Sequence, residues 1–340
     1  MKLSEIGEEA LIERIIKENL LPRSGPGLVV GVGDDAAVLS AAALAKAEEL
    51  TLITTDMLVE GTHFRLDLTT PFQLGWKSVA ESISDIAAMG GIPTWTFVSM
   101  GFSPDTEVEF IDELYKGMTE CTGRFTSRLI GGDTNSVKGV SVISIFQMGR
   151  VEPDHLMRRS GARIGDRILV TGFLGDSRGG LELLLKYGLD EAARLSNALV
   201  GAHLSPMPRV PEARAAVEMG AVHAMMDISD GLAADLPKLC KASREGATVF
   251  ADKLPISDEL RKSAGILGVN AVDLAVGGGE EFELLMAVAP DGVDKVIKAV
   301  EDNTGVCVTE IGEITEGPVE IVYPDGTQKP LKGGWEHFSN

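Results

Sequence analysis

The stretch AVHAMMDISDGLAADLPKLC, residues 221–240, indicates how this chain folds. A Met-containing apolar run ends at the polar turn 227–231, and a helical pattern follows over 232–242. Apolar runs that end in short Gly- and Asp-containing turns and continue as amphipathic segments are typical of strand–loop–helix units. The predicted class is therefore α/β or mixed α+β.

The same alternation recurs along the chain. Periodicity predicts helices over 74–89, 107–120 and 293–300, and apolar runs predict strands over 94–100, 140–148, 167–171 and 282–288. Thr106 and Glu109 have the spacing of a capping box at the start of the second of these helices. An amphipathic helix is also expected over 4–20.

A change in composition separates two halves. Residues 152–166 are polar, basic and Gly-containing, and a chain of 340 residues exceeds what one core usually supports. We therefore expect two domains, 1–150 and 151–340. Each half contains a Ser-Asp step before an Ala-rich segment, at Ser84-Asp85 and at Ser229-Asp230, which hints at a duplication without proving one.

Charge restricts the class of partner. The chain has 31 Lys and Arg against 51 Asp and Glu, a formal net charge of −20 at pH 7. Such a balance disfavours a nucleic-acid-binding surface and adsorption to anionic lipid, so neither nucleic acid nor membrane is expected as a partner. A phosphorylated ligand stays compatible, because divalent cations bridge carboxylates to phosphate.

The cysteines and the first residues bear on the compartment. Cys121, Cys240 and Cys307 lie far apart, which disfavours both a zinc knuckle and a disulfide framework. The first 19 residues show no signal-peptide core, and no stretch approaches the length of a membrane span. The expectation is a soluble, cytoplasmic protein.

Acidic residues recur where apolar runs end, usually beside Gly, Ser or Thr. They stand in Asp34-Asp35, Thr54-Thr55-Asp56, Asp85, Gly131-Gly132-Asp133, Asp227-Ile228-Ser229-Asp230 and Gly278-Gly279-Glu280-Glu281. Because Asp and Ser are also ordinary turn and N-cap residues, one such loop carries little information. Six loops of the same form favour ligand binding beyond strand ends.

If these loops converge, their charges need cations. Two carboxylates about 4 Å apart repel by about 4 kcal/mol at an effective dielectric near ~20. Oxygen ligands with Thr and Ser nearby favour Mg²⁺ over zinc. Mg²⁺ on a loose carboxylate set normally shares its shell with phosphate, which favours a nucleotide or phosphoryl-transfer site.

The common nucleotide motifs do not account for these loops. The chain has no GxxxxGK[ST] pattern and no HRD or DFG kinase signature. Residues 31–36, GVGDDA, match G-x-G-x-x-G/A after an apolar run. A Rossmann interpretation is disfavoured, because two aspartates would then face the pyrophosphate of the ligand.

Eight segments together carry a resemblance that none carries alone. They are GVGDDAAV (31–38), TTDMLVEGTHF (54–64), SDIAAMGG (84–91), IGGDT (130–134), RRSGA (158–162), DISDGL (227–232), GGEEFEL (278–284) and WEHF (335–338). In this order and spacing, across nearly the whole chain, they resemble the thiamine-monophosphate kinases, in the superfamily of aminoimidazole ribonucleotide synthetase. The resemblance implies ATP-dependent phosphorylation of thiamine monophosphate to thiamine diphosphate.

The resemblance also implies an architecture. Each chain would have two α/β domains, and the N-terminal domains would pair as a homodimer around a shared β-barrel. Residues 1–150 would bind ATP and Mg²⁺ and dimerise, and residues 151–340 would form a C-terminal α/β domain that completes the active site.

Roles follow from the resemblance by position. The implied Mg²⁺ ligands are Asp35, Thr54, Thr55, Asp56, Asp85, Asp133, Asp227 and Asp230. The implied ATP contacts are Tyr115 near the adenine, and Gly132, Asp133, Arg159 and Ser229 at the phosphates. The implied contacts of the thiamine ligand are His63, Glu280 and Trp335, and a carboxylate and an aromatic ring suit a cationic thiazolium. The residues implied for catalysis are Asp56, Asp133, Arg159 and Asp230.

The implied chemistry is direct, in-line transfer. The acceptor phosphate is already anionic, so no strong general base is needed, and Mg²⁺ with Arg159 would screen the two phosphate groups from each other. The departures from the family pattern are small: Glu281 stands where Asp is frequent, and Trp335 where Tyr or Trp is frequent.

Other interpretations stay open. A selenophosphate synthetase would need a reactive Cys or selenocysteine near its N-terminus, whereas the first cysteine here is Cys121. The hydrogenase-maturation relative ends in a Cys-bearing tail, which this chain lacks. The remaining alternatives are an ATP-dependent synthetase of the purine pathway and, from another class, a non-catalytic acidic metal-binding module.

Overall fold

The computed structural model describes residues 14, 17–18, 26–30, 38–39 and 48–335. The chain divides into two compact units: unit 1 consists of residues 1–86 and 91–154, and unit 2 of residues 87–90 and 155–340. Asp35, the motif 31–36 and most of the helix expected over 4–20 lie outside the described residues. None of the described helices is both long and apolar enough to cross a lipid bilayer.

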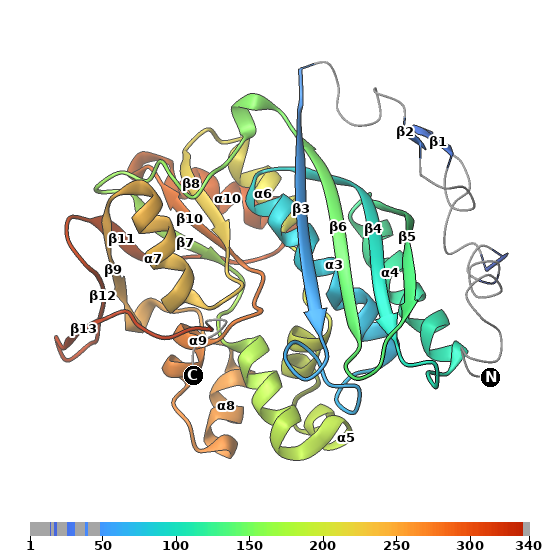
Figure 1. Cartoon of the computed structure of the whole chain (residues 1–340). Helices are drawn as coiled ribbons and strands as arrows, with labels where there is room; N and C mark the ends of the chain where they lie inside the picture. Colours follow the sequence, from blue (N-terminus) through green and yellow to red (C-terminus); the bar gives the residue numbers. More distant parts are fainter. Residues whose placement is uncertain (1–13, 15–16, 19–25, 31–37, 40–47, 336–340) are drawn as a thin grey trace. The chain divides into compact units, whose positions relative to one another are not determined.

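Unit 1 contains a four-stranded sheet with the order β3-β6-β4-β5 (Figure 1). Its strands are β3 (Leu50–Val59), β6 (Val142–Val151), β4 (Ile92–Phe102) and β5 (Arg128–Ser136). The pairs β3–β6 and β6–β4 are antiparallel, and β4–β5 is parallel. Parallel neighbours need a crossover connection, which here is helix α4 (Val108–Arg124).

One face of this sheet is covered by α4 and by α3 (Pro71–Ala88). Two glycines let the helices approach each other, because a Cβ at Gly75 would lie 2.0 Å from Leu114 O and one at Gly117 would lie 2.0 Å from Phe72 O. Side chains alternate along β3, so that every second residue faces the helices. On the opposite face Ile53 and Met57 are 60% and 59% exposed.

A small antiparallel pair, β1 (Leu28–Val30) with β2 (Val38–Leu39), also belongs to unit 1. Leu28 is buried against Trp95 and Ile130, and Phe97 and Met148 pack on this cluster.

The predicted capping box at Thr106 is wrong. Helix α4 begins at Val108 with Glu107 as N-cap, and no side chain caps it. The backbone of Glu107 is still extended, with a ψ of 141°, so Thr106 lies one residue too early to be the N-cap. The amide of Thr106 donates instead to the carbonyl of Ser103 in the preceding turn.

Unit 2 contains a seven-stranded sheet with the order β13-β12-β9-β11-β7-β10-β8. Its strands are β7 (Arg167–Thr171), β8 (Val222–Asp227), β9 (Gly246–Phe250), β10 (Leu284–Val288), β11 (Val308–Thr315), β12 (Val319–Val322) and β13 (Gln328–Pro330). All pairs are antiparallel except β9–β12. The mixed sheets of both units fit the α+β form of the predicted class.

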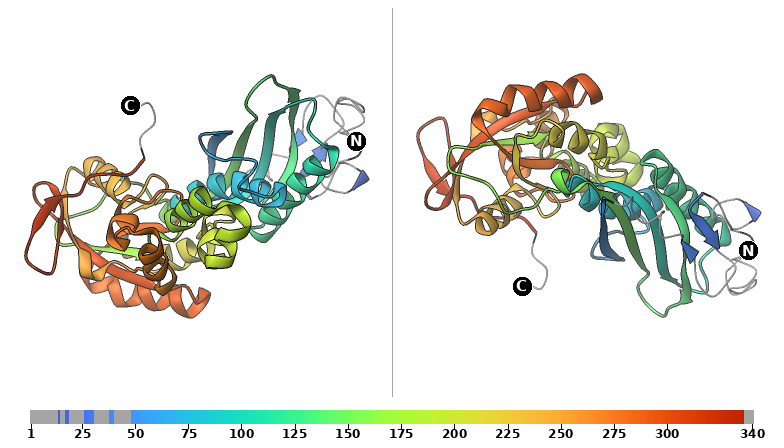
Figure 2. Two further views of the ribbon diagram at one scale, coloured as in Figure 1. Left: turned by 90° about the horizontal axis from the view of Figure 1, so that it is seen from below. Right: turned by 90° about the horizontal axis from the view of Figure 1, so that it is seen from above.

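Helices cover both faces of the central strands of unit 2. Helix α7 (Leu232–Ser243) lies on one face, and α6 (Val210–Val217) with α10 (Val293–Thr304) lies on the other (Figure 2). All five residues of β10 are therefore buried, which is why this strand is a continuous apolar run instead of an alternating one.

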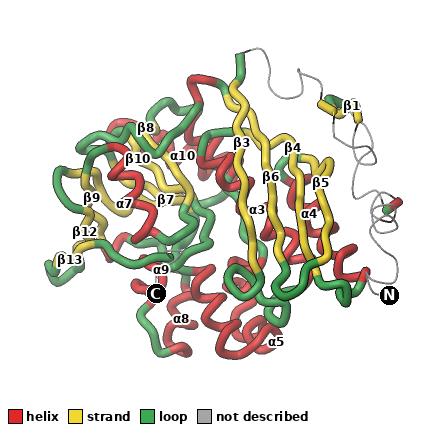
Figure 3. The backbone as a smooth tube through the Cα atoms, viewed as in Figure 1, coloured by secondary structure: helices red, strands yellow, loops and turns green. Residues whose placement is uncertain are grey.

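Helices α5 (Asp176–Leu204), α8 (Asp258–Leu267) and α9 (Ala271–Gly277) pack together in unit 2 (Figure 3). Helix α5 is interrupted by non-helical backbone at Gly188 and Ser196. Helix α9 leads directly into Gly278–Glu281, so the loop with Glu280 follows a helix and not a strand.

Candidate active site

Three candidate ligands of unit 1 lie together between β3 and α3. The Thr54 hydroxyl donates a hydrogen bond of 2.6 Å to Asp85 Oδ2, and the Ser82 hydroxyl donates one of 2.6 Å to Asp56 Oδ2. Thr54 and Asp56 are two residues apart in a strand, so both face the helix that carries Asp85. The alternation of β3 and the position of Asp85 on α3 build this group.

The electrostatics of this group suit a cation. Burial, together with the neighbouring Asp85, raises the pKa of Asp56 to about 6, although the hydrogen bond from Ser82 opposes the shift. A positive ion between the carboxylates would offset the repulsion from Asp85 that adds to the effect of burial on this pKa. The oxygen donors of Thr54, Asp56 and Asp85 are the kind that Mg²⁺ prefers.

Two other candidates of unit 1 lie on the opposite face of the sheet. The Thr55 hydroxyl donates to Ile145 O at 2.8 Å. Strand pairing places Asp133 beside Ser99, Ser99 beside Ser144, and Ser144 beside Met57. Residues in one such row point to the same face of a sheet, so Asp133 lies on the exposed face with Met57. The structure therefore does not group Thr55 and Asp133 with Thr54, Asp56 and Asp85.

The neighbours of Asp133 explain the local sequence. A Cβ at Gly132 would lie 1.8 Å from Val98 O, so only glycine fits where β5 passes β4. Asn135 Nδ2 donates to Asp133 Oδ2 at 2.6 Å. Tyr115 is buried in α4, its hydroxyl is hydrogen-bonded to Thr134, and burial raises its pKa to about 12. Contact of Tyr115 with adenine stays a prediction.

His63 follows the end of β3. The amide of Val59 donates to His63 Nδ1 at 3.0 Å, so this nitrogen is the acceptor and the proton of a neutral ring is assigned to Nε2. The turn thus fixes the orientation of the ring, and a contact with substrate stays a prediction.

In unit 2, three separated motifs meet. The amide of Glu280 donates to Ser229 O at 2.7 Å, and the amide of Trp335 donates to Asp230 O at 2.8 Å. Glycines make the approach possible, because a Cβ at Gly279 would lie 2.8 Å from Ser229 O and one at Gly334 would lie 2.7 Å from Asp230 O. The loops of DISDGL and GGEEFEL and the first residue of WEHF therefore form one surface.

A buried aspartate organises the turn between β8 and α7. Asp235 Oδ2 accepts the amide hydrogens of Ser229 and Asp230, at 3.0 and 2.9 Å. Lys238 Nζ lies 2.7 Å from Asp235 Oδ1 and 2.5 Å from Asp230 Oδ2. Burial raises the pKa of Asp235 despite Lys238. Burial opposes the charge of Lys238, yet its two carboxylate partners leave its pKa above the usual value.

Arg159 lies apart from this surface within unit 2. Its carbonyl accepts a hydrogen bond from Ser243, the last residue of α7, whereas Asp230 precedes the first. A helix of 12 residues is about 18 Å long. The backbone of Arg159 and that of Asp230 are therefore at opposite ends of α7, and the phosphate contact of Arg159 stays a prediction.

The rule that acids follow strand ends holds only in part. Asp227 ends β8 and is buried. Asp56 and Asp133 lie inside strands that continue to Val59 and Ser136, and Asp85 lies inside α3. Strand pairing with β6 and β4 extends these strands past the apolar runs that suggested their ends. Among the described residues, no group of three or more His, Cys, Asp or Glu side chains is arranged to hold a metal ion.

Several polar residues of the site were missed from sequence. Asp235 lies on the apolar side of α7, together with Leu232, Leu236 and Leu239. An acidic residue on an apolar helix face could have indicated a buried polar role from the sequence. Glu283 directly precedes β10, a strand that is wholly apolar. Ser82 and Arg209 gave no comparable signal, because their partners lie far away in sequence.

Comparison with known proteins assigns both parts of the chain to one class. Residues 33–151 match the family model "AIR synthase related protein, N-terminal domain", and residues 163–324 match "AIR synthase related protein, C-terminal domain". The fold and these matches define a two-domain protein of the AIR synthase related class.

Full-length relatives narrow the class. The thiamine-monophosphate kinase of Aquifex aeolicus is 34% identical over 99% of this chain and 100% of its own. The crystal structure of thiamine-monophosphate kinase from Stenotrophomonas maltophilia K279a has a TM-score of 0.81 and 34% identity, covering 94% of this chain and 97% of that one. A structure described as "AaThiL complexed with AMPPCP and TMP" has a TM-score of 0.75 and 33% identity, with 99% of both chains covered. The chain belongs to the thiamine-monophosphate kinase family.

Proposed function

We propose that this protein transfers the γ-phosphate of ATP to thiamine monophosphate, giving thiamine diphosphate and ADP. The observation that carries the proposal is the direct hydrogen bonding of three separated motifs in unit 2, where Glu280 binds the carbonyl of Ser229 and Trp335 binds that of Asp230. A related structure holds AMPPCP and TMP, the two ligand types this reaction needs.

Unit 1 supplies a cation site for the reaction. Thr54, Asp56 and Asp85 would hold Mg²⁺, with the remaining positions completed by phosphate oxygens, since Mg²⁺ usually binds one or two carboxylates together with substrate phosphate. When bound, Mg²⁺ neutralises charge on the transferring and accepting phosphates. We assign Asp35, Thr55, Asp133, Asp227 and Asp230 as further ligands on family resemblance.

Unit 2 supplies the contacts with the thiamine part. Glu280 and Trp335 bind the Ser229–Asp230 turn through their backbone amides, and the ring of Trp335 is half-exposed. A carboxylate and an aromatic ring of this kind suit a cationic heterocycle. Ser229, Gly132 and Arg159 are assigned to the phosphates of ATP, Tyr115 to its adenine, and His63 to the thiamine ligand. Because the acceptor oxygen is already anionic, these residues need only orient the two phosphates for in-line attack.

The proposal includes a homodimer formed through unit 1. The face of its sheet opposite α3 and α4 exposes Ile53, Met57 and Phe146, and Phe97 packs edge-on against Phe146 with the ring centroids 5.9 Å apart. Large apolar side chains exposed together on one sheet face are costly in water. A second copy of the sheet would bury it and close the barrel that the family resemblance implies. We expect the dimer to act in the cytoplasm without nucleic-acid or membrane partners.

An acceptor panel tests the proposal against its alternatives. Purified protein with Mg²⁺ and ATP is given thiamine monophosphate, free thiamine or substrates of the purine pathway, and the products are separated by chromatography. Formation of ADP with thiamine monophosphate alone supports the proposal. ADP formed only with a purine-pathway substrate would assign the chain to that activity, and metal binding without ATP consumption would support the binding module.

A further inference from the structure

The loop that carries Glu280 has unusual backbone. Glu280 and Phe282 have φ values of 59° and 52°, in the left-handed region that non-glycine residues rarely adopt. Such a conformation persists only where surrounding contacts enforce it. Glu281, which lies between them, and Glu283, which follows Phe282, are both buried.

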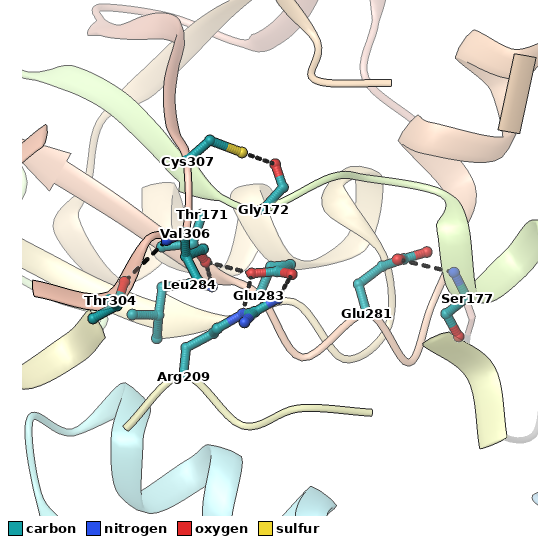
Figure 4. A network of polar contacts seen from close by, with 10 residues as sticks. All are labelled: Thr171, Gly172, Ser177, Arg209, Glu281, Glu283, Leu284, Thr304, Val306 and Cys307. Atoms are coloured by element: carbon teal, nitrogen blue, oxygen red, sulfur yellow. Dashed lines mark hydrogen bonds and ion pairs between the residues drawn. The ribbon is translucent and has the colours of Figure 1, made fainter. Parts of the chain in front are cut away.

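Glu283 is the more strongly held of the two (Figure 4). Arg209 donates to both of its carboxylate oxygens, from Nε at 2.7 Å and from Nη2 at 2.6 Å. The Thr171 hydroxyl donates to Oε2 at 2.6 Å and accepts the amide of Leu284 at 2.8 Å. A bidentate pair of this kind fixes orientation as well as position.

The backbone beside Glu283 is shaped to admit it. A Cβ at Gly172 would lie 2.1 Å from Glu283 Oε1, and Gly172 has a φ of 58°. Only glycine therefore leaves room for the carboxylate at this end of β7.

Glu281 provides a second anchor. Its carboxylate accepts the amides of Ser177 and Arg178, at 3.2 and 3.4 Å, at the start of α5. Burial raises the pKa of Glu281 well above its usual value. His203, at the end of α5, contacts the Ser177 hydroxyl and lies with Nδ1 3.4 Å from Glu280 Oε2.

We propose that Glu283, held by Arg209, is a positioning residue that keeps Glu280 in the left-handed conformation in which its carboxylate contacts the thiamine ligand. The proposal rests on the proposed function, which assigns Glu280 to that ligand. Backbone hydrogen bonds link Glu283 to Glu280 through the neighbouring strand end. The Ile228 amide donates to Glu283 O, the Phe282 amide donates to Ile228 O, and the Glu280 amide donates to Ser229 O. Loss of the Arg209–Glu283 pair therefore weakens these three backbone hydrogen bonds, and Glu280 loses its fixed conformation.

The test is Glu283→Gln in the full chain. Its matched control is Glu313→Gln, which breaks a different Arg–Glu pair, the one with Arg167. Arg167 lies at the start of β7, whereas Thr171, which contacts Glu283, lies at its end. We expect Glu283→Gln to raise the KM for thiamine monophosphate about tenfold, the cost of one misplaced charged hydrogen bond. The KM for ATP stays unchanged. Hydrogen exchange of the segment 278–284 becomes faster than in the control.

A second pair of variants covers failure of Glu283→Gln to fold. Gly172→Ala presses on the Glu283 carboxylate, whereas Gly188→Ala changes a glycine of similar φ with nothing within 4 Å of its Cβ. Only Gly172→Ala is expected to raise the acceptor KM and the exchange rate, and equal behaviour of the two would overturn the proposal.

The outcomes separate this proposal from the proposed function. Turnover by the wild type with an unchanged acceptor KM in Glu283→Gln would overturn the positioning role and leave the function standing. A rise in both KM values together would also overturn it, because a general structural loss acts on both ligands. Absence of wild-type turnover with thiamine monophosphate would overturn both.

Discussion

Lys238 Nζ lies 2.7 Å from one oxygen of Asp235, whose other oxygen accepts the amides of Ser229 and Asp230. The same ammonium group lies 2.5 Å from Asp230 Oδ2. Lys238 of α7 thus contacts Asp230 directly. The charges of Lys238 and Asp235 hold the Ser229–Asp230 turn in place.

Lys238 is a cationic partner of both Asp230 and Asp235. Lys238→Met leaves Asp230 and Asp235 without their cationic partner, so a divalent cation relieves more repulsion in the variant than in the wild type. We expect Mg²⁺ to raise the Tm of Lys238→Met by more than that of the wild type. Lys116→Met, which breaks an exposed pair with Glu113, serves as control. Equal Mg²⁺-induced shifts in all three proteins would contradict the prediction.

Asp56 separates activity from stability. Asp56→Asn keeps an acceptor for the Ser82 hydroxyl but removes the charge that Mg²⁺ needs, so we expect turnover to be abolished while the protein stays folded. Because the folded pKa of Asp56 is raised to about 6, its ionised form is costly at pH 8, and the variant should be at least as stable there. Chemical denaturation and an ADP assay measure the two effects.

Asp230→Asn should likewise abolish turnover, and wild-type turnover in either variant would refute its assignment.

Asp176 gives a pH dependence of stability. Burial raises its pKa to about 6, and Ser257 donates to its Oδ1 at 2.6 Å. A carboxyl with a raised folded pKa stabilises the fold below its unfolded pKa, and this contribution is lost as the pH rises to about 6. The full effect corresponds to about 3 kcal/mol.

Asp176→Asn isolates this contribution. The free energy of unfolding of the wild type, relative to that of the variant, should fall between pH 4 and pH 6.5 and then level off. Urea titrations across this range give the difference, and a constant difference would show that Asp176 does not carry the shift.

The proposed dimer depends on the face of the unit 1 sheet that lies opposite α3 and α4. Ile53→Glu places a charge on a residue that is 60% exposed in the single chain, so the fold should be kept and the dimer lost. Sedimentation velocity measures the mass in solution. Ile266→Glu, at a 47% exposed position of α8 in unit 2, should leave the dimer intact. A wild-type monomer, or a dimer that survives Ile53→Glu, would remove this interface.

Local sequence predicted the elements better than the site. The strands over 94–100, 167–171 and 282–288 and the helix over 232–242 were predictable because apolar runs and helical periodicity record burial directly. The ends of elements were not predictable in this way. In β3, pairing with β6 continues through Asp56 to Val59, which places the aspartate inside the strand.

The candidate residues could be found by motif, but their grouping could not. Thr54 and Thr55 are adjacent in sequence, yet strand alternation puts the first against Asp85 and the second on the opposite face. Arg209 and Glu283 are 74 residues apart, and only the packing of α6 against the sheet shows that they pair. Long-range pairs of this kind leave no local periodicity to read.

The measurement that tests the central claim most directly follows the phosphate itself. The protein is incubated with Mg²⁺, thiamine monophosphate and ATP labelled in its γ-phosphate, and the products are separated. The account predicts label in the terminal phosphate of thiamine diphosphate, in equal amount to the ADP formed and lost when the metal is chelated. ADP without labelled thiamine diphosphate, or no consumption of ATP, would contradict it.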